Sequence, residues 1–145
     1  MRDVALRYFR CLDTEDWAEM ARLWTPDAQL RAVGARPRND REGVIEYFSK
    51  LFGPWHRHRD HPERLIVSEP DRTVVAEVTF TGTTADGRDV RFEAVDVFDF
   101  EAGLIRKLTN WYDIDYARRA IAPGAVAGRR PAAVVVDGRA SPEED

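Results

Sequence analysis

The sequence predicts a single-domain α+β protein in which helices pack on a curved antiparallel sheet and enclose one apolar pocket. Three observations lead to this fold class. The chain has 145 residues, which is the size of one domain with its own core. Apolar residues recur at helical spacing through the first third of the chain. Strand-like runs separated by hairpin signals then follow.

Composition narrows the range of partners and locations. The formal net charge of −4 argues against nucleic acid as a partner, because phosphate binding normally uses a basic face. No segment approaches about twenty consecutive apolar residues, and acidic residues occur too early for a signal peptide. We therefore expect a cytoplasmic protein without a membrane partner. Cys11 is the only cysteine, which excludes an intrachain disulfide.

Three helices are predicted in the N-terminal third. Apolar residues at helical spacing indicate a first helix over Val4–Leu12 and a second from Trp17 to Trp24. Asn39 and Glu42 have the spacing of a capping box, and they predict a third helix that ends at the Gly53-Pro54 pair. A short strand, Ala28–Val33, and a loop, Gly34–Arg38, are expected between the second and third helices.

Four strands are expected in the second half, joined by Pro70-Asp71, Asp86-Gly87 and Ala102-Gly103 as hairpin signals. They are Arg64–Ser68, Thr73–Thr83, Val90–Phe100 and Leu104–Ile114, and they form an antiparallel meander. The division into domains is then 1–116 for the folded unit and 117–145 for a flexible tail rich in Ala, Pro, Gly and Arg. Within that tail, Ala132–Val136 could pair as an edge strand.

One carboxylate interrupts an apolar strand face. Phe92, Ala94, Phe98 and Asp96 share a face by period two. A carboxylate there must be paired, hydrogen-bonded, held protonated or turned toward a pocket, because burying an unpaired charge is costly. The alternative to a pocket role is a salt bridge with an arginine on a neighbouring strand.

Two further residues are candidates because of their register with Asp96. If Asp86-Gly87 is a two-residue turn, Glu77 lies opposite Asp96, and two facing carboxylates would separate into an acid and a base. On the last strand, Asn110 falls on the same face as Asp96 and could hydrogen-bond its carboxyl group or a substrate oxygen.

All three histidines lie in the connector Trp55–His61. His56, His58 and His61 are candidates for a general base at the mouth of the pocket, and we single out His58. A His-x-His pair can also bind a divalent metal, but the polar, arginine-rich surroundings favour an exposed loop, and we expect no metal.

The order of elements resembles the cone-shaped fold of the nuclear transport factor 2 superfamily, which includes ketosteroid isomerases and SnoaL-like polyketide cyclases. The opening of the chain, the loop before the third helix and the last hairpin carry the resemblance. The stretches are Tyr8-Phe9, Asp16-Trp17, Leu23-Trp24, Pro26-Asp27-Ala28, Gly34–Arg38 and Ala94–Ile105. The resemblance implies three N-terminal helices on a curved antiparallel sheet around a pocket.

The resemblance also implies roles for individual residues. Tyr8 and Asp96 fall where ketosteroid isomerases keep the two side chains that donate hydrogen bonds to the developing oxyanion. The run Gln29–Val33 lacks the carboxylate that serves as their base. Epoxide hydrolases of this fold carry an aspartate where this chain has Asn110, and an Arg-x-Asp pair where it has Glu77-Val78-Thr79. The SnoaL-like cyclases match best.

The sequence therefore predicts a cofactor-free acid–base enzyme that cyclises or isomerises a hydrophobic, oxygenated, polyketide-like intermediate of secondary metabolism. Asp96 is the expected acid, Tyr8 its helper, Asn110 the orienting amide, and Glu77 or His58 the base. The expected apolar wall consists of Leu12, Phe48, Phe52, Trp55, Phe92, Phe98, Leu108 and Tyr112. The alternatives are a non-catalytic binding or interaction module of the same fold, and epoxide opening. Apolar residues on both faces of the long strands also predict a homodimer through the outer face of the sheet.

Overall fold

The structure is a computed structural model, and it describes residues 1–123. Four helices and one five-stranded sheet make up the described chain. The elements in chain order are α1 (Arg2–Thr14), α2 (Trp17–Arg22), β1 (Trp24–Ala32), α3 (Arg41–Phe52), β2 (Trp55–Ser68), β3 (Thr73–Thr84), β4 (Asp89–Glu101), β5 (Leu104–Tyr112) and α4 (Ile114–Ile121). The predicted α+β class, with helices packed on a curved sheet, is confirmed.

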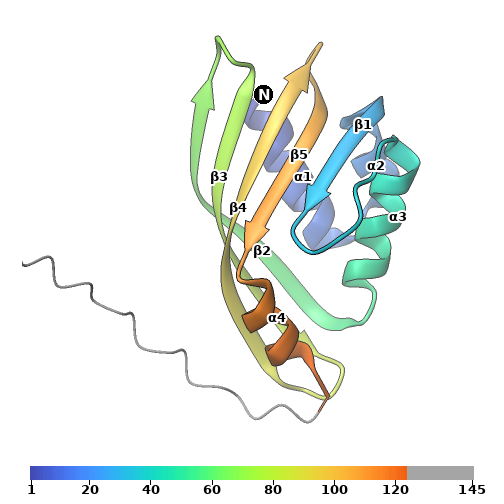
Figure 1. Ribbon diagram of the computed structural model, residues 1–145, viewed down its shortest axis with the longest axis vertical. Helices are drawn as coiled ribbons and strands as arrows, with labels where there is room; N and C mark the ends of the chain where they lie inside the picture. Colours follow the sequence, from blue (N-terminus) through green and yellow to red (C-terminus); the bar gives the residue numbers. More distant parts are fainter. Residues whose placement is uncertain (124–145) are drawn as a thin grey trace, which may run out of the picture.

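The strands are arranged in the order β1-β5-β4-β3-β2. The last four in sequence form the predicted antiparallel meander, whereas β1 pairs with β5 in parallel. Figure 1 shows α1 behind the sheet, α3 beside the β1 edge and α4 at the end of β5. This arrangement leaves one sheet face covered by helices, and the core and the cavity lie there.

The N-terminal helices form because their apolar residues share one face and their ends are capped. In α1 this face is buried and includes Ala5, Phe9 and Leu12. The helix ends where Glu15 adopts a left-handed conformation with φ +53°. The third helix is capped by Asp40, whose side chain accepts a hydrogen bond from the Gly43 amide at 2.7 Å. The predicted capping box at Asn39 is therefore wrong by one residue.

Several predicted boundaries differ from the structure. The second helix ends at Arg22, and Trp24 already belongs to β1. The connector Trp55–His61 is not a loop but the first half of the long strand β2. Its polar character reflects an exposed outer face and edge rather than a lack of structure.

The first residues of the predicted tail are helical. The last strand ends at Tyr112, and Asp113 caps α4 by accepting a hydrogen bond from the Tyr116 amide at 2.9 Å. Residues 117–121, assigned to the tail, thus belong to a helix. The expected edge strand Ala132–Val136 lies outside the described residues.

The hairpin between β3 and β4 sets which side chains face the cavity. The Thr84 amide donates a hydrogen bond to the Arg88 carbonyl at 2.9 Å, so three residues, 85–87, form the turn between them, and Gly87 takes the positive φ of +84° that such a turn requires. Asp96 is therefore opposite Ala76, and Glu77 is opposite Val95. The predicted Glu77–Asp96 pairing assumed a two-residue turn and is wrong by one position, which places Glu77 on the other face of the sheet.

Candidate functional site

A cavity of about 530 Å³ lies between the helix-covered face of the sheet and helices α1, α3 and α4. Its walls are mainly apolar, and its volume is typical of a site for a small organic molecule. Six of the eight predicted wall residues line it: Leu12, Phe48, Phe52, Trp55, Phe92 and Tyr112. Phe98 and Leu108 do not, because they are fully buried in the protein core. The C-terminal helix, which sequence analysis missed, contributes Ala117 and Ile121.

Polar groups from four elements meet in this apolar cavity. They are Tyr8 on α1, Asp60 on β2, Asp96 on β4 and Asn110 on β5. Charged side chains, Lys50, Asp86 and Arg88, also border the cavity. Three of the five predicted catalytic residues are therefore brought together, and Asp60 joins them in place of Glu77.

Asp96 and Asn110 form a hydrogen-bonded pair on neighbouring strands. The two residues are directly opposite each other in the β4–β5 ladder, and the Asn110 Nδ2 group donates to Asp96 Oδ1 at 2.5 Å. Asp96 is only 4% exposed. Burial raises the pKa of Asp96 to about 6, and the amide hydrogen bond opposes that rise by stabilising the carboxylate. The pKa of Asp96 is therefore close to neutral pH, and a general acid or base is most effective when its pKa is close to the working pH.

Asp60 is the site residue that sequence reasoning missed. Its amide donates a hydrogen bond to Asp13 Oδ1 at 2.8 Å, while its own Oδ2 is buried without a hydrogen-bond partner among the described residues. Burial raises the pKa of Asp60 well above its usual value, and the nearby carboxylates of Asp96 and Asp13 raise it further. Strand periodicity was the available signal: once 55–61 is assigned as a strand, Asp60 falls on the same face as His58.

Tyr8 is held rigidly against the same cavity. Its ring makes edge-to-face contacts with Phe9, Phe48 and Phe98, with ring centroids 5.1 to 5.8 Å apart. Burial raises the pKa of the Tyr8 hydroxyl well above its usual value, and the charges of Asp96 and Asp60 add to that effect. The hydroxyl is therefore protonated at neutral pH and can donate a hydrogen bond to a group in the cavity.

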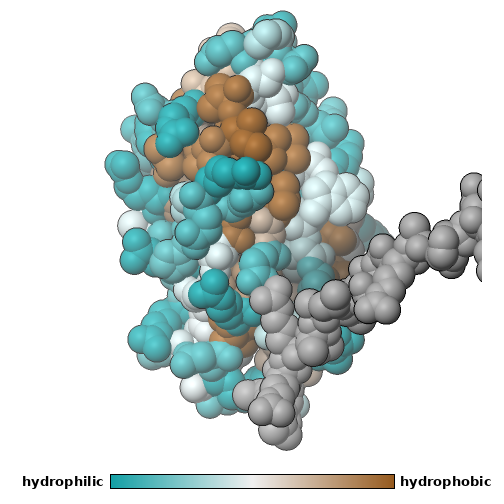
Figure 2. Space-filling model, turned by 90° about the vertical axis from the view of Figure 1, so that its left-hand side faces the viewer, coloured by the Kyte–Doolittle hydropathy of each residue, from teal (hydrophilic) through white to brown (hydrophobic). Residues whose placement is uncertain are grey.

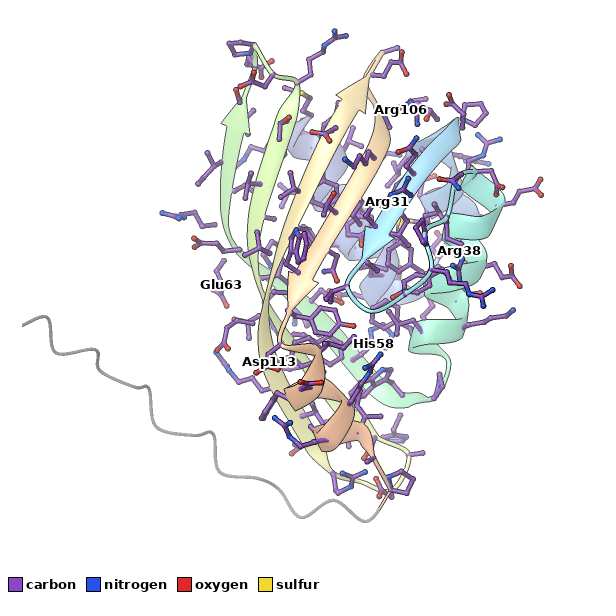
Figure 3. All side chains as sticks on the ribbon, in the orientation of Figure 1. Arg31, Arg38, His58, Glu63, Arg106 and Asp113 are labelled. Atoms are coloured by element: carbon purple, nitrogen blue, oxygen red, sulfur yellow. The ribbon has the colours of Figure 1, made fainter. Side chains whose placement is uncertain are left out.

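His58 lies just outside the cavity wall. It is on β2, close to the end of α3, and its ring stacks on Phe52 with centroids 4.3 Å apart (Figure 3). Its Nε2 atom is 3.1 Å from Glu15 Oε1, and its Nδ1 atom is buried without a partner among the described residues. A ring nitrogen of His58 and carboxylate oxygens of Asp13 and Asp60 lie within 4.8 Å of one another, so this cluster has the residue types of a metal site.

The remaining candidates lie away from the cavity. Glu77 forms an ion pair with Arg64 on the exposed face of the sheet. The His61 ring is 3.3 Å from the Thr81 hydroxyl and does not border the cavity, and neither does His56. Glu77 therefore does not face the cavity and is not positioned to serve as the predicted base.

The chain belongs to the SnoaL-like domain family, whose model matches residues 5–108. No curated protein sequence matches it. No helix among residues 1–123 is both long enough and apolar enough to cross a membrane.

Solved structures share the fold. A candidate SnoaL-like polyketide cyclase from Jannaschia sp. is 20% identical, with a TM-score of 0.74 over 82% of this chain and 89% of that chain. SalBIII, an epoxide hydrolase/cyclase-like enzyme of pyran ring formation in the polyether salinomycin, is 21% identical, with a TM-score of 0.70 over 79% and 92%. An epoxide hydrolase of the LEH-like type from M. tuberculosis is 15% identical, with a TM-score of 0.69 over 82% and 86%. At these identities the likeness establishes the NTF2-like fold, which hosts several chemistries.

Proposed function

We propose that this chain is a cofactor-independent acid–base enzyme that isomerises or cyclises a hydrophobic, oxygenated small molecule of the polyketide kind. One observation carries the proposal: two carboxyl groups, Asp60 and Asp96, face the same apolar cavity, and neither forms an ion pair within residues 1–123. Carboxyl groups in such surroundings ionise one after the other, which supplies an acid and a base from chemically similar groups.

The surroundings of the two groups support different roles for them. Asp96 has a pKa of about 6 and accepts a hydrogen bond from Asn110, so it is ionised at neutral pH and serves as the general base. Asp60 has a strongly raised pKa and keeps its proton once Asp96 is ionised. Asp60 and Tyr8 are then the donors that stabilise the enolate oxygen formed when Asp96 removes a proton next to a carbonyl. This differs from the acid role that the family resemblance implies for Asp96.

The apolar wall supports this chemistry. A mainly apolar cavity excludes water from the enolate and binds the hydrocarbon part of the substrate. An enolate is the shared intermediate of double-bond migration and of intramolecular aldol closure. The same three residues, Asp96, Asp60 and Tyr8, would therefore serve both reactions.

The experiment is α-proton exchange. A panel of apolar ketones and 1,3-diketones is incubated with the protein in heavy water, and deuterium incorporation is followed by NMR. We expect catalysed exchange in the parent, a loss of about 100-fold or more in Asp96→Asn, and little change in Asp99→Asn. Asp99 is a matched control because it lies on the same strand with its side chain on the other face, where it accepts a hydrogen bond from Thr73 at 2.9 Å. Binding of ketones without exchange would instead identify a binding module.

Epoxide opening is the second candidate, since an ionised and a protonated carboxyl group could activate water and protonate an epoxide oxygen. The fold likeness to an epoxide hydrolase from M. tuberculosis supports testing it. Incubation of apolar epoxides in ¹⁸O-labelled water separates the two reactions. Labelled diols without ketone exchange would favour epoxide opening.

A further inference from the structure

We propose that Glu15, His58 and Asp60 form a proton-transfer triad behind the cavity wall, in which His58 exchanges one proton with Asp60 and Glu15 holds the imidazole ring. The proposal rests on the proposed function for its role in turnover, but its geometry is tested without any substrate.

Two unsatisfied polar atoms are the first observation. Within residues 1–123, His58 Nδ1 and Asp60 Oδ2 are both buried and lack a hydrogen-bond partner. Buried polar atoms are almost always satisfied in folded proteins. The two side chains belong to a cluster whose ligand atoms lie within 4.8 Å of one another. A small torsional change of Asp60, or one bridging water, would join them.

The two atoms are complementary in their hydrogen-bonding roles. The Nε2 atom of His58 faces the Glu15 carboxylate at 3.1 Å, which favours the tautomer that carries its proton on Nε2. Nδ1 is then an acceptor. Burial and the nearby carboxylates raise the pKa of Asp60, which favours its protonated form, and the protonated carboxyl group can donate a hydrogen bond from Oδ2. One O–H···N hydrogen bond therefore satisfies both atoms.

Proton transfer along this bond balances without any co-reactant. The proton leaves Asp60 Oδ2 and binds His58 Nδ1, which yields a carboxylate and an imidazolium. Glu15 stabilises the imidazolium through the Nε2–H group, and the reverse step restores the starting state. Asp60 can then act as an acid or as a base within one turnover, depending on where the proton lies.

Several acidic side chains lie around the triad. Asp13 on α1 and Asp96 on β4 both lie near Asp60, and Glu15 follows α1. Tyr8, on α1, is also close to Asp60. Arg59 is 3.7 Å from Asp13 Oδ2, but its side chain is 67% exposed. An imidazolium at His58 would thus face a group of carboxylates from inside the protein.

The triad also reaches the surface. The His58 side chain is only 3% exposed, whereas that of Glu15 is 45% exposed. Water can therefore reach Glu15 but not the ring. We regard His58 as a positioning residue, since Asp60 is the member of the triad that borders the cavity.

The test is ¹⁵N NMR of the full chain with labelled histidine. In the parent we expect His58 to show a protonated Nε2 and a hydrogen-bonded Nδ1 at neutral pH. Asp60→Ala should change the Nδ1 resonance, and Glu15→Gln should change the Nε2 resonance. His61→Gln is the control, because His61 lies on the same strand outside the cavity and should leave both resonances unchanged. A His58 Nδ1 resonance that is the same in the parent and in Asp60→Ala would overturn the triad.

Turnover gives a second measurement once α-proton exchange is established. His58→Gln and Glu15→Gln should lower kcat by about tenfold to 100-fold with little change in KM, which is less than the loss of a direct general acid or base. Added imidazole should restore part of the rate of His58→Gln. Glu15→Gln keeps the experiment decisive if His58→Gln does not fold, because Glu15 is at the surface.

Binding of one Zn²⁺ ion per parent chain, abolished in Asp60→Ala, would identify a metal site and overturn the triad. Failure of ketone exchange alone would count against the proposed function and leave the NMR result standing.

Discussion

Replacement of Asp96 by asparagine should stabilise the protein at neutral pH. The pKa of Asp96 in the folded protein is about 6, against an ordinary value of 3.8 for an aspartate. A carboxyl group whose pKa is raised on folding binds more protons in the folded state, so its contribution to stability is present below pH 3.8 and is lost as pH rises through 6. A difference of about two pKa units corresponds to about 3 kcal/mol.

Asparagine keeps the shape of the side chain and can still accept the hydrogen bond from Asn110, but it removes the buried charge. We expect Asp96→Asn to be more stable than the parent at pH 8 by up to about 3 kcal/mol, with the difference vanishing near pH 4. For a chain of this size the gain corresponds to a Tm increase of roughly 6 to 12 °C.

The assay is calorimetric or urea unfolding of parent and variant between pH 4 and pH 8. Asp99→Asn, on the opposite face of β4, controls for loss of a charge from the same strand. A variant that is clearly less stable than the parent at pH 8 would falsify the conclusion that Asp96 is an unpaired pocket carboxyl, because removing one partner of a buried ion pair is destabilising.

Three other expectations follow from the same geometry. Tyr8→Phe should lower ketone exchange by on the order of 100-fold without changing the circular dichroism spectrum, since only one oxyanion donor is removed and the ring packing is kept; full activity would exclude Tyr8 from the reaction. Glu77→Gln should leave exchange unchanged and cost less than about 1 kcal/mol in urea unfolding, because the Arg64 ion pair is exposed; a large loss of exchange would contradict the register. Trp111 is 59% exposed beside Val95 on the outer face of the sheet, so sedimentation should show a dimer for the parent and a monomer for Trp111→Glu; a monomeric parent at micromolar concentration would end the dimer proposal.

The molecular surface is consistent with an apolar contact area. Figure 2 shows the side of the molecule that carries the β2 edge, where apolar side chains form a patch in the upper half among hydrophilic ones. Ile66, on β2, is 49% exposed, and Val95, on β4, is 37% exposed. An exposed apolar surface of this kind is typical of protein–protein contacts, and we propose it as the surface through which the dimer forms.

The sequence by itself determined the fold class, most of the elements and three of the four polar residues of the site: Tyr8, Asp96 and Asn110. Helical spacing around Tyr8 and strand alternation around Asp96 are local patterns, and each indicates which side of the helix or strand is buried. Because Asp96 interrupts an apolar face, its unusual environment could be inferred from its neighbours in the sequence alone. The amide partner Asn110 followed from the same alternation across one short hairpin.

Only the tertiary structure decided which carboxyl group joins Asp96. A loop of three residues instead of two between β3 and β4 moves Glu77 to the outer face, and a turn signal in the sequence does not fix that length. Asp60 reaches the cavity because β2 lies at the far edge of the sheet and the sheet curves around α1, which brings the strand close to Asp13 and Asp96. These contacts join residues more than 35 positions apart, and the raised pKa of Asp60 results from desolvation by elements that a local sequence pattern does not describe.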